Sequence, residues 1–173
     1  MGINDKIKIV EFNPSYAEQI AFFITESMCY FNNRPRKIRE DVFNIKDYYL
    51  DNGGNFWCAI DPELDKVIGT IALEKRNNYG VLKRFYVDED YQNQNIGIGL
   101  YAAFEEYVVN SANINALYLA CGKALEKARR FYYQNGWGLI ALLPEGLSFP
   151  AEDDWFFKEI NWCVENLLAR PSI

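Results

Sequence analysis

The residues with the clearest chemical potential lie in one glycine-containing stretch near the middle of the chain. Residues 87–100 read VDEDYQNQNIGIGL, a polar loop that leads through a Gly-x-Gly motif into an apolar, helix-forming run. Glycine lets the backbone approach a ligand closely, and the first N–H groups of a helix have no partner within it. The positive end of the helix dipole adds to the attraction for anions. Gly97 and Gly99 therefore predict a binding site for an anion such as a pyrophosphate.

Two other interpretations of this motif stay open. In the first, the glycines only form a tight turn that packs the helix against the preceding strand. In the second, Gly97, Gly99 and Ala102 form the G-x-G-x-x-A fingerprint of a nucleotide-dependent oxidoreductase. That fingerprint follows its strand almost directly and has an acidic residue about 20 positions further on. Here the loop is long and the next expected strand ends in Ala-Cys-Gly, with no acid.

The chain contains no histidine, which excludes every nucleophile system in which His activates Ser or Cys. We expect no metal site, because only scattered Cys and carboxylate ligands remain. The cysteines at positions 29, 58, 121 and 163 form no CxxC pair and lie in apolar stretches, which favours core packing over redox, metal or disulfide roles. Any chemistry must then depend on Tyr, Glu, Asp, water or backbone dipoles.

Length and composition indicate one soluble domain that spans residues 1–173. Half of the residues are hydrophobic, which is far from a disordered composition. No apolar run approaches the ~20 residues of a membrane helix, and the polar N-terminus lacks a secretory signal, so we expect a cytoplasmic protein without a membrane partner. The formal net charge of −6 argues against nucleic acid as a partner and favours a cationic substrate.

Hydrophobic periodicity predicts a mixed α/β sheet that positions the glycine loop. We expect strands at 6–12, 55–60, 66–75, 79–87, 116–120, 137–142 and 155–160, and helices at 16–28, 38–50, 97–110 and 125–134. A breaker at 32–35 separates the first two helices. This order predicts a largely antiparallel sheet with about four helices, and a parallel crossover from strand 79–87 to strand 116–120 through helix 97–110.

Two segments resemble the GNAT acyltransferase superfamily. Residues 82–108 are similar to its coenzyme-binding segment, with Gln94 to Gly99 matching a Gln/Arg-x-x-Gly-x-Gly/Ala loop. The second family signature, Ala-x-x-Phe-Tyr followed by Gly and an aromatic residue, is matched by Ala128, Phe131, Tyr132, Gly136 and Trp137, and residues 154–158 resemble the last strand. The chain departs from the pattern where it has Leu125 in place of a common Asn and Cys121 in place of a common Val.

The resemblance implies a GNAT-like fold and an N-acetyltransferase that uses acetyl-CoA as co-substrate. It implies that the loop holds the pyrophosphate and that the end of the preceding strand pairs with the pantetheine amides. The implied coenzyme-binding residues are Phe85, Tyr86, Val87, Gln94, Asn95, Ile96, Gly97, Ile98, Gly99 and Leu100. A backbone N–H near Val87 would polarise the thioester carbonyl.

The resemblance suggests one catalytic residue, and position in the expected sheet suggests another. Tyr132 is the expected general acid for the leaving thiolate, because a phenol with a pKa near 10 suits that task; the alternative is that it only packs in an aromatic cluster. Glu74, near a strand end, is the carboxylate expected as general base; the alternative is a solvated Glu paired with Lys75 or Arg76.

The acceptor is expected to be a primary amine of a small molecule or a peptide, attacked directly within a ternary complex. The residues expected at its entrance are Glu26, Tyr30, Phe31, Glu152, Asp153 and Asp154, which form either an acidic, aromatic mouth for a cation or a solubilising surface. The alternative function is a non-catalytic module of the same fold that binds acyl-CoA. Aromatic residues in the expected strands are compatible with a homodimer.

Overall fold

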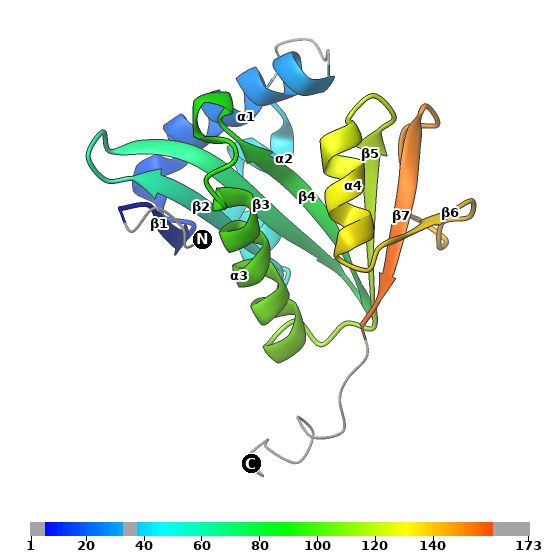
Figure 1. The fold of residues 1–173 in the computed structure, drawn as a ribbon. Helices are drawn as coiled ribbons and strands as arrows, with labels where there is room; N and C mark the ends of the chain where they lie inside the picture. Colours follow the sequence, from blue (N-terminus) through cyan, green and yellow to red (C-terminus); the bar gives the residue numbers. More distant parts are fainter. Residues whose placement is uncertain (1–5, 33–37, 161–173) are drawn as a thin grey trace.

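A seven-stranded mixed sheet is the centre of the computed structural model, which describes residues 6–32 and 38–160 (Figure 1). Its strands are β1 (Lys8–Glu11), β2 (Asn55–Asp61), β3 (Lys66–Arg76), β4 (Tyr79–Val87), β5 (Ala116–Gly122), β6 (Gly138–Ile140) and β7 (Asp153–Glu159). Their spatial order is β1-β2-β3-β4-β5-β7-β6. The β4–β5 pair is parallel and the other described pairs are antiparallel, so the predicted crossover is confirmed.

Helices cover both faces of the sheet. They are α1 (Ala17–Asn32), α2 (Glu40–Phe43), α3 (Ile96–Asn110) and α4 (Glu126–Gln134), with short helical turns at Pro14–Tyr16, Lys46–Leu50 and Glu89–Tyr91. In Figure 1, α3 and α4 lie on the near face of the sheet, while α1 and α2 lie behind it. The mixed α/β architecture expected from the sequence is therefore confirmed.

The core has two layers because the central strands are buried on both faces. Along β2, Phe56, Cys58 and Ile60 pack with residues of α1 and α2, whereas Trp57 and Ala59 pack with residues of α3. Successive side chains of a strand point to opposite faces, so a strand with helices on both sides is a continuous apolar run. This arrangement places α3 and α4 on one side of β4, and α1 and α2 on the other.

The helix predicted at 38–50 is interrupted in the structure. It divides into α2 and the π-helical turn Lys46–Leu50, because Asn44 leaves the helical conformation with φ −124° and ψ 55°. The interruption allows Asp41 and Tyr49 both to point into the core, where the Tyr49 hydroxyl donates a hydrogen bond to the Asp41 carboxylate. The expected strand 137–142 is also shorter, since only Gly138–Ile140 pairs with β7. The breaker residues 33–35 and Cys163 lie outside the described residues.

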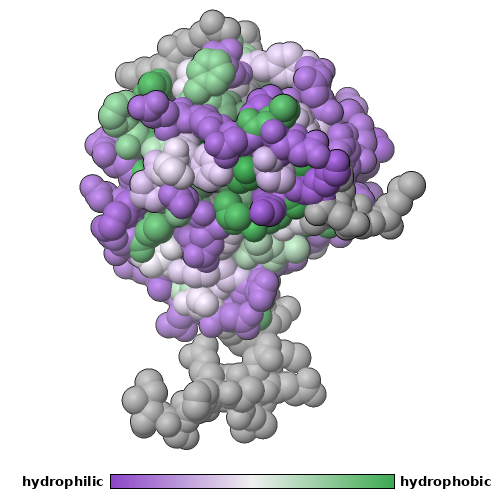
Figure 2. Space-filling view, turned by 90° about the vertical axis from the view of Figure 1, so that its left-hand side faces the viewer, coloured by the Kyte–Doolittle hydropathy of each residue, from purple (hydrophilic) through white to green (hydrophobic). Residues whose placement is uncertain are grey.

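The surface on the side of β1 and β2 is mainly hydrophilic. Figure 2 shows this face, where hydrophobic residues occur only in small separate areas. Within residues 6–32 and 38–160, no helix has the length and apolar character needed to cross a membrane. The same ranges contain no cluster of His, Cys, Asp and Glu residues that could hold a metal ion. Cys29, Cys58 and Cys121 are free thiols, and the last two are buried in the core, as predicted.

Candidate active site

The parallel strands β4 and β5 separate partway along their length. Only residues 79–81 pair with residues 116–118, although β4 continues to Val87 and β5 to Gly122. The two strands form a V in Figure 1, and a cleft of about 1280 Å³ opens where they part. The loop before α3 and the start of α4 complete its lining. Backbone groups on separated strand edges have lost their ladder partners and can bind an extended ligand.

The loop before α3 presents an uncapped helix start to the cleft. Asn93 and Asn95 both have φ of +62°, a left-handed conformation that Asn tolerates better than most residues. Asn95 is the N-cap of α3, and its side chain makes no capping hydrogen bond. Ile96 to Ile98 follow and line the cleft. The first N–H groups of α3 and its dipole are therefore available to an anion.

Gly97 leaves room for a ligand beside this helix start. A Cβ atom added at Gly97 would lie 3.6 Å from the Phe85 ring and 3.7 Å from a Val87 methyl group, at ordinary contact distances. Its φ is also outside the left-handed region. Packing and backbone conformation within the protein therefore do not require glycine at this position. The space beside Gly97 opens onto the cleft, which fits the close approach of a pyrophosphate.

The cleft includes most, but not all, of the predicted coenzyme-binding residues. Those that line it are Phe85, Tyr86, Val87, Asn95, Ile96, Gly97 and Ile98. The residues that line it do not include Gln94, Gly99 or Leu100. Leu100 is fully buried, where it would contact a Cβ added at Gly69. Gly99 donates its N–H to the Asn95 carbonyl, so this amide is already occupied by the first turn of α3.

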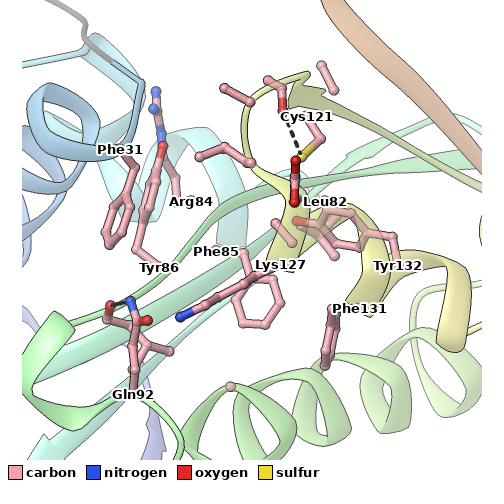
Figure 3. Close-up of a pocket in the computed structure, with 18 of the residues that line it drawn as sticks. Phe31, Leu82, Arg84, Phe85, Tyr86, Gln92, Cys121, Lys127, Phe131 and Tyr132 are labelled. Carbon is pink, nitrogen blue, oxygen red and sulfur yellow. Dashed lines mark hydrogen bonds between the residues drawn. The ribbon is translucent and has the colours of Figure 1, made fainter.

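Several polar residues that line the cleft were not predicted from the sequence, among them Lys83, Arg84, Glu89, Gln92, Lys123, Glu126 and Lys127. Gln92 lies in the loop before α3, and Lys127 lies in the first turn of α4. Figure 3 shows the Lys127 side chain extending into the cleft toward the side where Gln92 lies. Lys127 could have been predicted from the sequence. It lies in the first turn of the helix that follows β5, and β5 is the neighbour of the strand that leads into the coenzyme loop. Lys127 therefore adds a positive charge opposite the α3 N-terminus.

Tyr132 lies on α4 at the inner wall of the cleft. Its exposed fraction is 6%, and its ring centroid is 5.9 Å from Trp137 and 5.7 Å from Phe156. Burial raises the pKa of Tyr132 well above 10.0, and the nearby Cys121 adds to the increase. Burial also raises the pKa of the Cys121 thiol to about 12. The Tyr132 phenol thus both packs in an aromatic cluster and keeps its proton at neutral pH.

A bulge in β4 sets the direction of the side chains at the cleft. The β3–β4 register shifts between Ala72↔Lys83 and Thr70↔Tyr86, so that β4 has one extra residue. Phe85 then points toward α3 and α4, where it contacts the rings of Tyr101 and Phe131. Tyr86 points the opposite way and stacks on Phe31 of α1 at 6.3 Å. The cleft therefore has one wall beside α4 and another beside α1, as Figure 3 shows.

The lining of the cleft contains several residues predicted for the acceptor. Tyr30 of α1 and Glu89 of the loop before α3 both line the cleft. The cleft-lining members of the predicted group are Tyr30, Phe31, Glu152 and Asp153. Glu26 and Asp154 do not line the cleft, and Asp154 instead pairs with Arg129 at 2.8 Å. The aromatic rings of Tyr30 and Phe31 therefore line the cleft from α1, whereas Asp153 lines it from the side of β5, where it pairs with Gly122.

Glu74 lies outside the set of residues that line the cleft. Its carboxylate makes ion pairs with Arg76 at 2.5 Å and with Lys83 at 2.7 Å. Burial alone would raise the pKa of Glu74, but hydrogen bonds and charge from Lys83 and Arg76 outweigh it and lower that pKa. The structure thus shows the ion pair with Arg76 that the sequence left as the alternative.

Comparisons with known proteins show which family has this combination of features. A model of the acetyltransferase (GNAT) family matches residues 20–137. A crystal structure of a GNAT-family acetyltransferase from Staphylococcus aureus Mu50 is similar at 32% identity, with a TM-score of 0.74, over 90% of this chain and 99% of that one. A search among curated proteins found no match.

Two more distant structures share the fold. One is the PaiA N-acetyltransferase from Thermoplasma acidophilum in complex with coenzyme A, at 20% identity, with a TM-score of 0.72, over 89% of this chain and 99% of that one. The other is spermidine N-acetyltransferase from Vibrio cholerae in complex with coenzyme A and spermine, at 14% identity, with a TM-score of 0.66, over 90% of this chain and 96% of that one.

The matched region includes the loop before α3, the splayed strands and Tyr132. It covers well over half of the 173 residues, and the Staphylococcus aureus relative covers most of the rest. The resemblance seen in the sequence is therefore confirmed, and the oxidoreductase interpretation of the Gly-x-Gly motif is not supported. The chain belongs to the acetyltransferase (GNAT) family, whose members use acetyl-CoA.

Proposed function

We propose that this chain transfers the acetyl group of acetyl-CoA to the nitrogen of a primary amine by direct attack within a ternary complex. The observation that carries the proposal is the cleft between β4 and β5, whose lining includes an uncapped helix start, a buried tyrosine, and aromatic and acidic side chains. Acetyl-CoA supplies an activated acetyl group as a thioester.

The residues at the loop fit the phosphate end of the coenzyme. Backbone N–H groups of Ile96 to Ile98 donate to the pyrophosphate, and Lys127 contributes its charge from the opposite wall. The edge of residues 85–87 has separated from β5, so the backbone of this segment can pair with the pantetheine amides. A backbone N–H of this segment, near Val87, polarises the thioester carbonyl.

Tyr132 supplies the proton that the leaving sulfur needs. As the amine nitrogen bonds to the acetyl carbon, the carbon–sulfur bond breaks and its electron pair stays on sulfur. The Tyr132 hydroxyl donates a proton to that thiolate, and the phenolate is reprotonated from water. The raised pKa keeps the phenol protonated at neutral pH, and it also makes Tyr132 a weaker proton donor than a tyrosine with a pKa near 10.

The base that takes the proton from the amine is a separate question. Glu74 stays a proposal for this role, although Lys83 and Arg76 lower its pKa and so reduce its basicity. Because Glu74 does not line the cleft, a proton would reach it through water. Glu74→Gln tests the role, and an unchanged dependence of kcat/KM on pH would remove Glu74 from the mechanism.

The acceptor that fits the wall beside α1 is a small amine carrying positive charge. The stacked rings of Phe31 and Tyr86 can contribute a cation–π interaction, and the carboxylates of Glu89, Glu152 and Asp153 add negative charge to the lining of the cleft. The net charge of −6 favours the approach of cations. The distant Vibrio cholerae relative, whose structure contains spermine, is consistent with this class.

Calorimetric titration with acetyl-CoA, followed by a thiol-release assay over mono-, di- and polyamines, tests the proposed function. We expect micromolar binding and turnover with at least one cationic amine. Binding without thiol release from any amine would favour the alternative, a non-catalytic acyl-CoA-binding module. No binding would contradict both.

A pair of neighbouring tyrosines provides a matched test of the acid. Tyr132→Phe should lower kcat about 100-fold while acetyl-CoA affinity stays unchanged, as general acid–base catalysis contributes about 10²–10⁴-fold. Tyr133→Phe is the control, because Tyr133 lies on the same helix but is 47% exposed. Equal rates for the two variants would contradict the role of Tyr132.

A further inference from the structure

Arg84 has an unusual backbone conformation for its place in the fold. It lies inside β4, yet its φ is +53°, a left-handed value that non-glycine residues rarely adopt within a strand. It falls between Lys83, which opposes Ala72, and Tyr86, which opposes Thr70. Arg84 is therefore part of the bulge at which the cleft-lining end of β4 begins. Such conformations persist only where surrounding contacts hold them.

The bulge determines which side chains the cleft receives. Lys83 and Arg84 are consecutive in a strand, yet both point toward the face that α1 and α2 cover. Lys83 contacts Tyr48 in the turn Lys46–Leu50, and Arg84 contacts Asp41 in α2. Beyond the bulge, Phe85 and Tyr86 again point to opposite faces. A one-residue slip in strand register moves every following side chain to the other face. Without the bulge, residues 85–87 would present the wrong faces to α4 and to α1.

A buried ion pair holds Arg84 in place. Its guanidinium donates two hydrogen bonds to the carboxylate of Asp41 in α2, at 2.8 Å and 2.6 Å, and a third to the sulfur of Met28 at 3.0 Å. The side chains of Arg84 and Asp41 are only 12% and 8% exposed. Tyr49 donates a further hydrogen bond to Asp41. Bidentate pairing of this kind fixes orientation as well as distance.

The backbone of Arg84 is anchored as well. The hydroxyl of Thr70, which is fully buried on β3, donates to the Arg84 carbonyl at 2.7 Å. The residue is thus fixed at both ends, by β3 through its main chain and by α2 through its side chain. Since α1 contributes Met28 to the same contact, the bulge is connected to the helix that carries Tyr30 and Phe31.

We propose that Arg84 is a positioning residue for acetyl transfer. Its ion pair with Asp41 holds the β4 bulge in the form that presents residues 85–87 to the thioester, and it connects this segment to the acceptor-side helices. The inference rests on the proposed function, because it assigns a role in the same reaction. A positioning role requires that the rate of catalysis depends on this ion pair, whereas a purely stabilising role would require only that folding depends on it.

The first experiment replaces the pair with apolar residues of similar volume. Arg84→Met combined with Asp41→Leu removes both charges, so no unpaired ion is left in the core, and such exchanges are often neutral for stability. We expect a folded protein with a Tm within a few degrees of wild type and an affinity for coenzyme A within about threefold. We expect kcat to fall about 10- to 100-fold, the range that misplacement of reacting groups produces.

Two further variants keep the test decisive if the double variant fails to fold. Arg84→Lys keeps the charge but loses the bidentate geometry, and we expect it to lower kcat with little change in coenzyme A affinity. Tyr49→Phe removes only the additional hydrogen bond to Asp41, and we expect a smaller decrease in kcat. Wild-type kcat in a folded Arg84→Lys variant or a folded double variant would overturn the proposal.

A measurement of strand register separates this inference from the proposed function. The wild type should show a cross-strand nuclear Overhauser effect between Thr70 and Tyr86, the pair that follows the bulge, and the double variant should lose it. If the wild type neither binds acetyl-CoA nor releases thiol, the proposed function fails. Loss of this signal in the double variant would still show that Arg84 sets the register. Retention of the signal in the double variant would contradict the inference even in an active enzyme.

Discussion

Replacement of Gly97 by Ala should leave the fold intact and weaken coenzyme binding. The added Cβ would meet its nearest neighbours, the side chains of Phe85 and Val87, at 3.6 Å and 3.7 Å, which requires no rearrangement. Alanine is better than glycine in a helix by up to about 1 kcal/mol. For a chain of this size, that corresponds to a rise in Tm of at most about 2–4 °C. We therefore expect Tm to stay unchanged or to rise slightly.

The same methyl group would occupy space in the cleft. An oxygen that accepts a hydrogen bond from a backbone amide lies about 2.9 Å from its nitrogen, so a pyrophosphate held at the start of α3 would compete with the new Cβ. We expect the Kd for acetyl-CoA to rise at least about tenfold, which corresponds to about 1.4 kcal/mol. Isothermal titration calorimetry on the wild type and on Gly97→Ala measures the change.

Gly138→Ala is the matched control, since a Cβ added at Gly138 in β6 meets no atom within 4 Å. Its Kd should equal that of the wild type. An unchanged Kd for Gly97→Ala would show that the coenzyme does not approach this backbone. A large fall in its Tm would instead refute the packing argument.

Three other predictions follow from the structure. Lys127→Ala should weaken acetyl-CoA binding about tenfold, the value of one charge-assisted hydrogen bond, and should reduce the salt dependence of Kd. Arg130→Ala on the same helix should leave both the Kd and its salt dependence unchanged. Burial would raise the pKa of Asp41, but Arg84 outweighs burial and lowers that pKa. The ion pair therefore stabilises the fold above about pH 4 and stabilises it less as the pH falls. The difference in Tm between wild type and Asp41→Asn should shrink below pH 4, and a constant difference would refute this. Gly80→Ala should destabilise the fold by about 1–3 kcal/mol in urea denaturation through overpacking, because its Cβ would lie 2.6–3.0 Å from three core side chains; unchanged stability would show that the core can relax.

The fold could be predicted from local patterns because each element depends on short-range periodicity. Alternation identified the strands, and the Gly-x-Gly loop identified the start of α3. The interruption of the helix at 38–50 was missed, because it depends on contacts of Asp41 and Tyr49 with each other and with distant Arg84. Contacts between distant parts of the chain produce no periodic pattern in the sequence, so the break in this helix could not be predicted.

The site was predictable only where it depends on backbone chemistry. The separation of β4 from β5 leaves no pattern in the sequence, since it depends on pairing between distant strands that stops after residues 79–81 and 116–118. The bulge does leave a signal, because consecutive cations at Lys83 and Arg84 break the alternation of β4. For Glu74, the neighbouring Arg76 was visible in the sequence, whereas Lys83 comes from the adjacent strand and could be assigned only once the register was known.

The central claim is that the cleft between β4 and β5 binds acetyl-CoA with its phosphates at the start of α3. Titration of isotope-labelled protein with acetyl-CoA, followed through backbone amide chemical shifts, tests it most directly. We expect the largest shifts at Ile96 to Ile98 and along residues 85–87, with little change at β1 and β6. Saturable shifts confined to another surface, or no shifts at all, would contradict it.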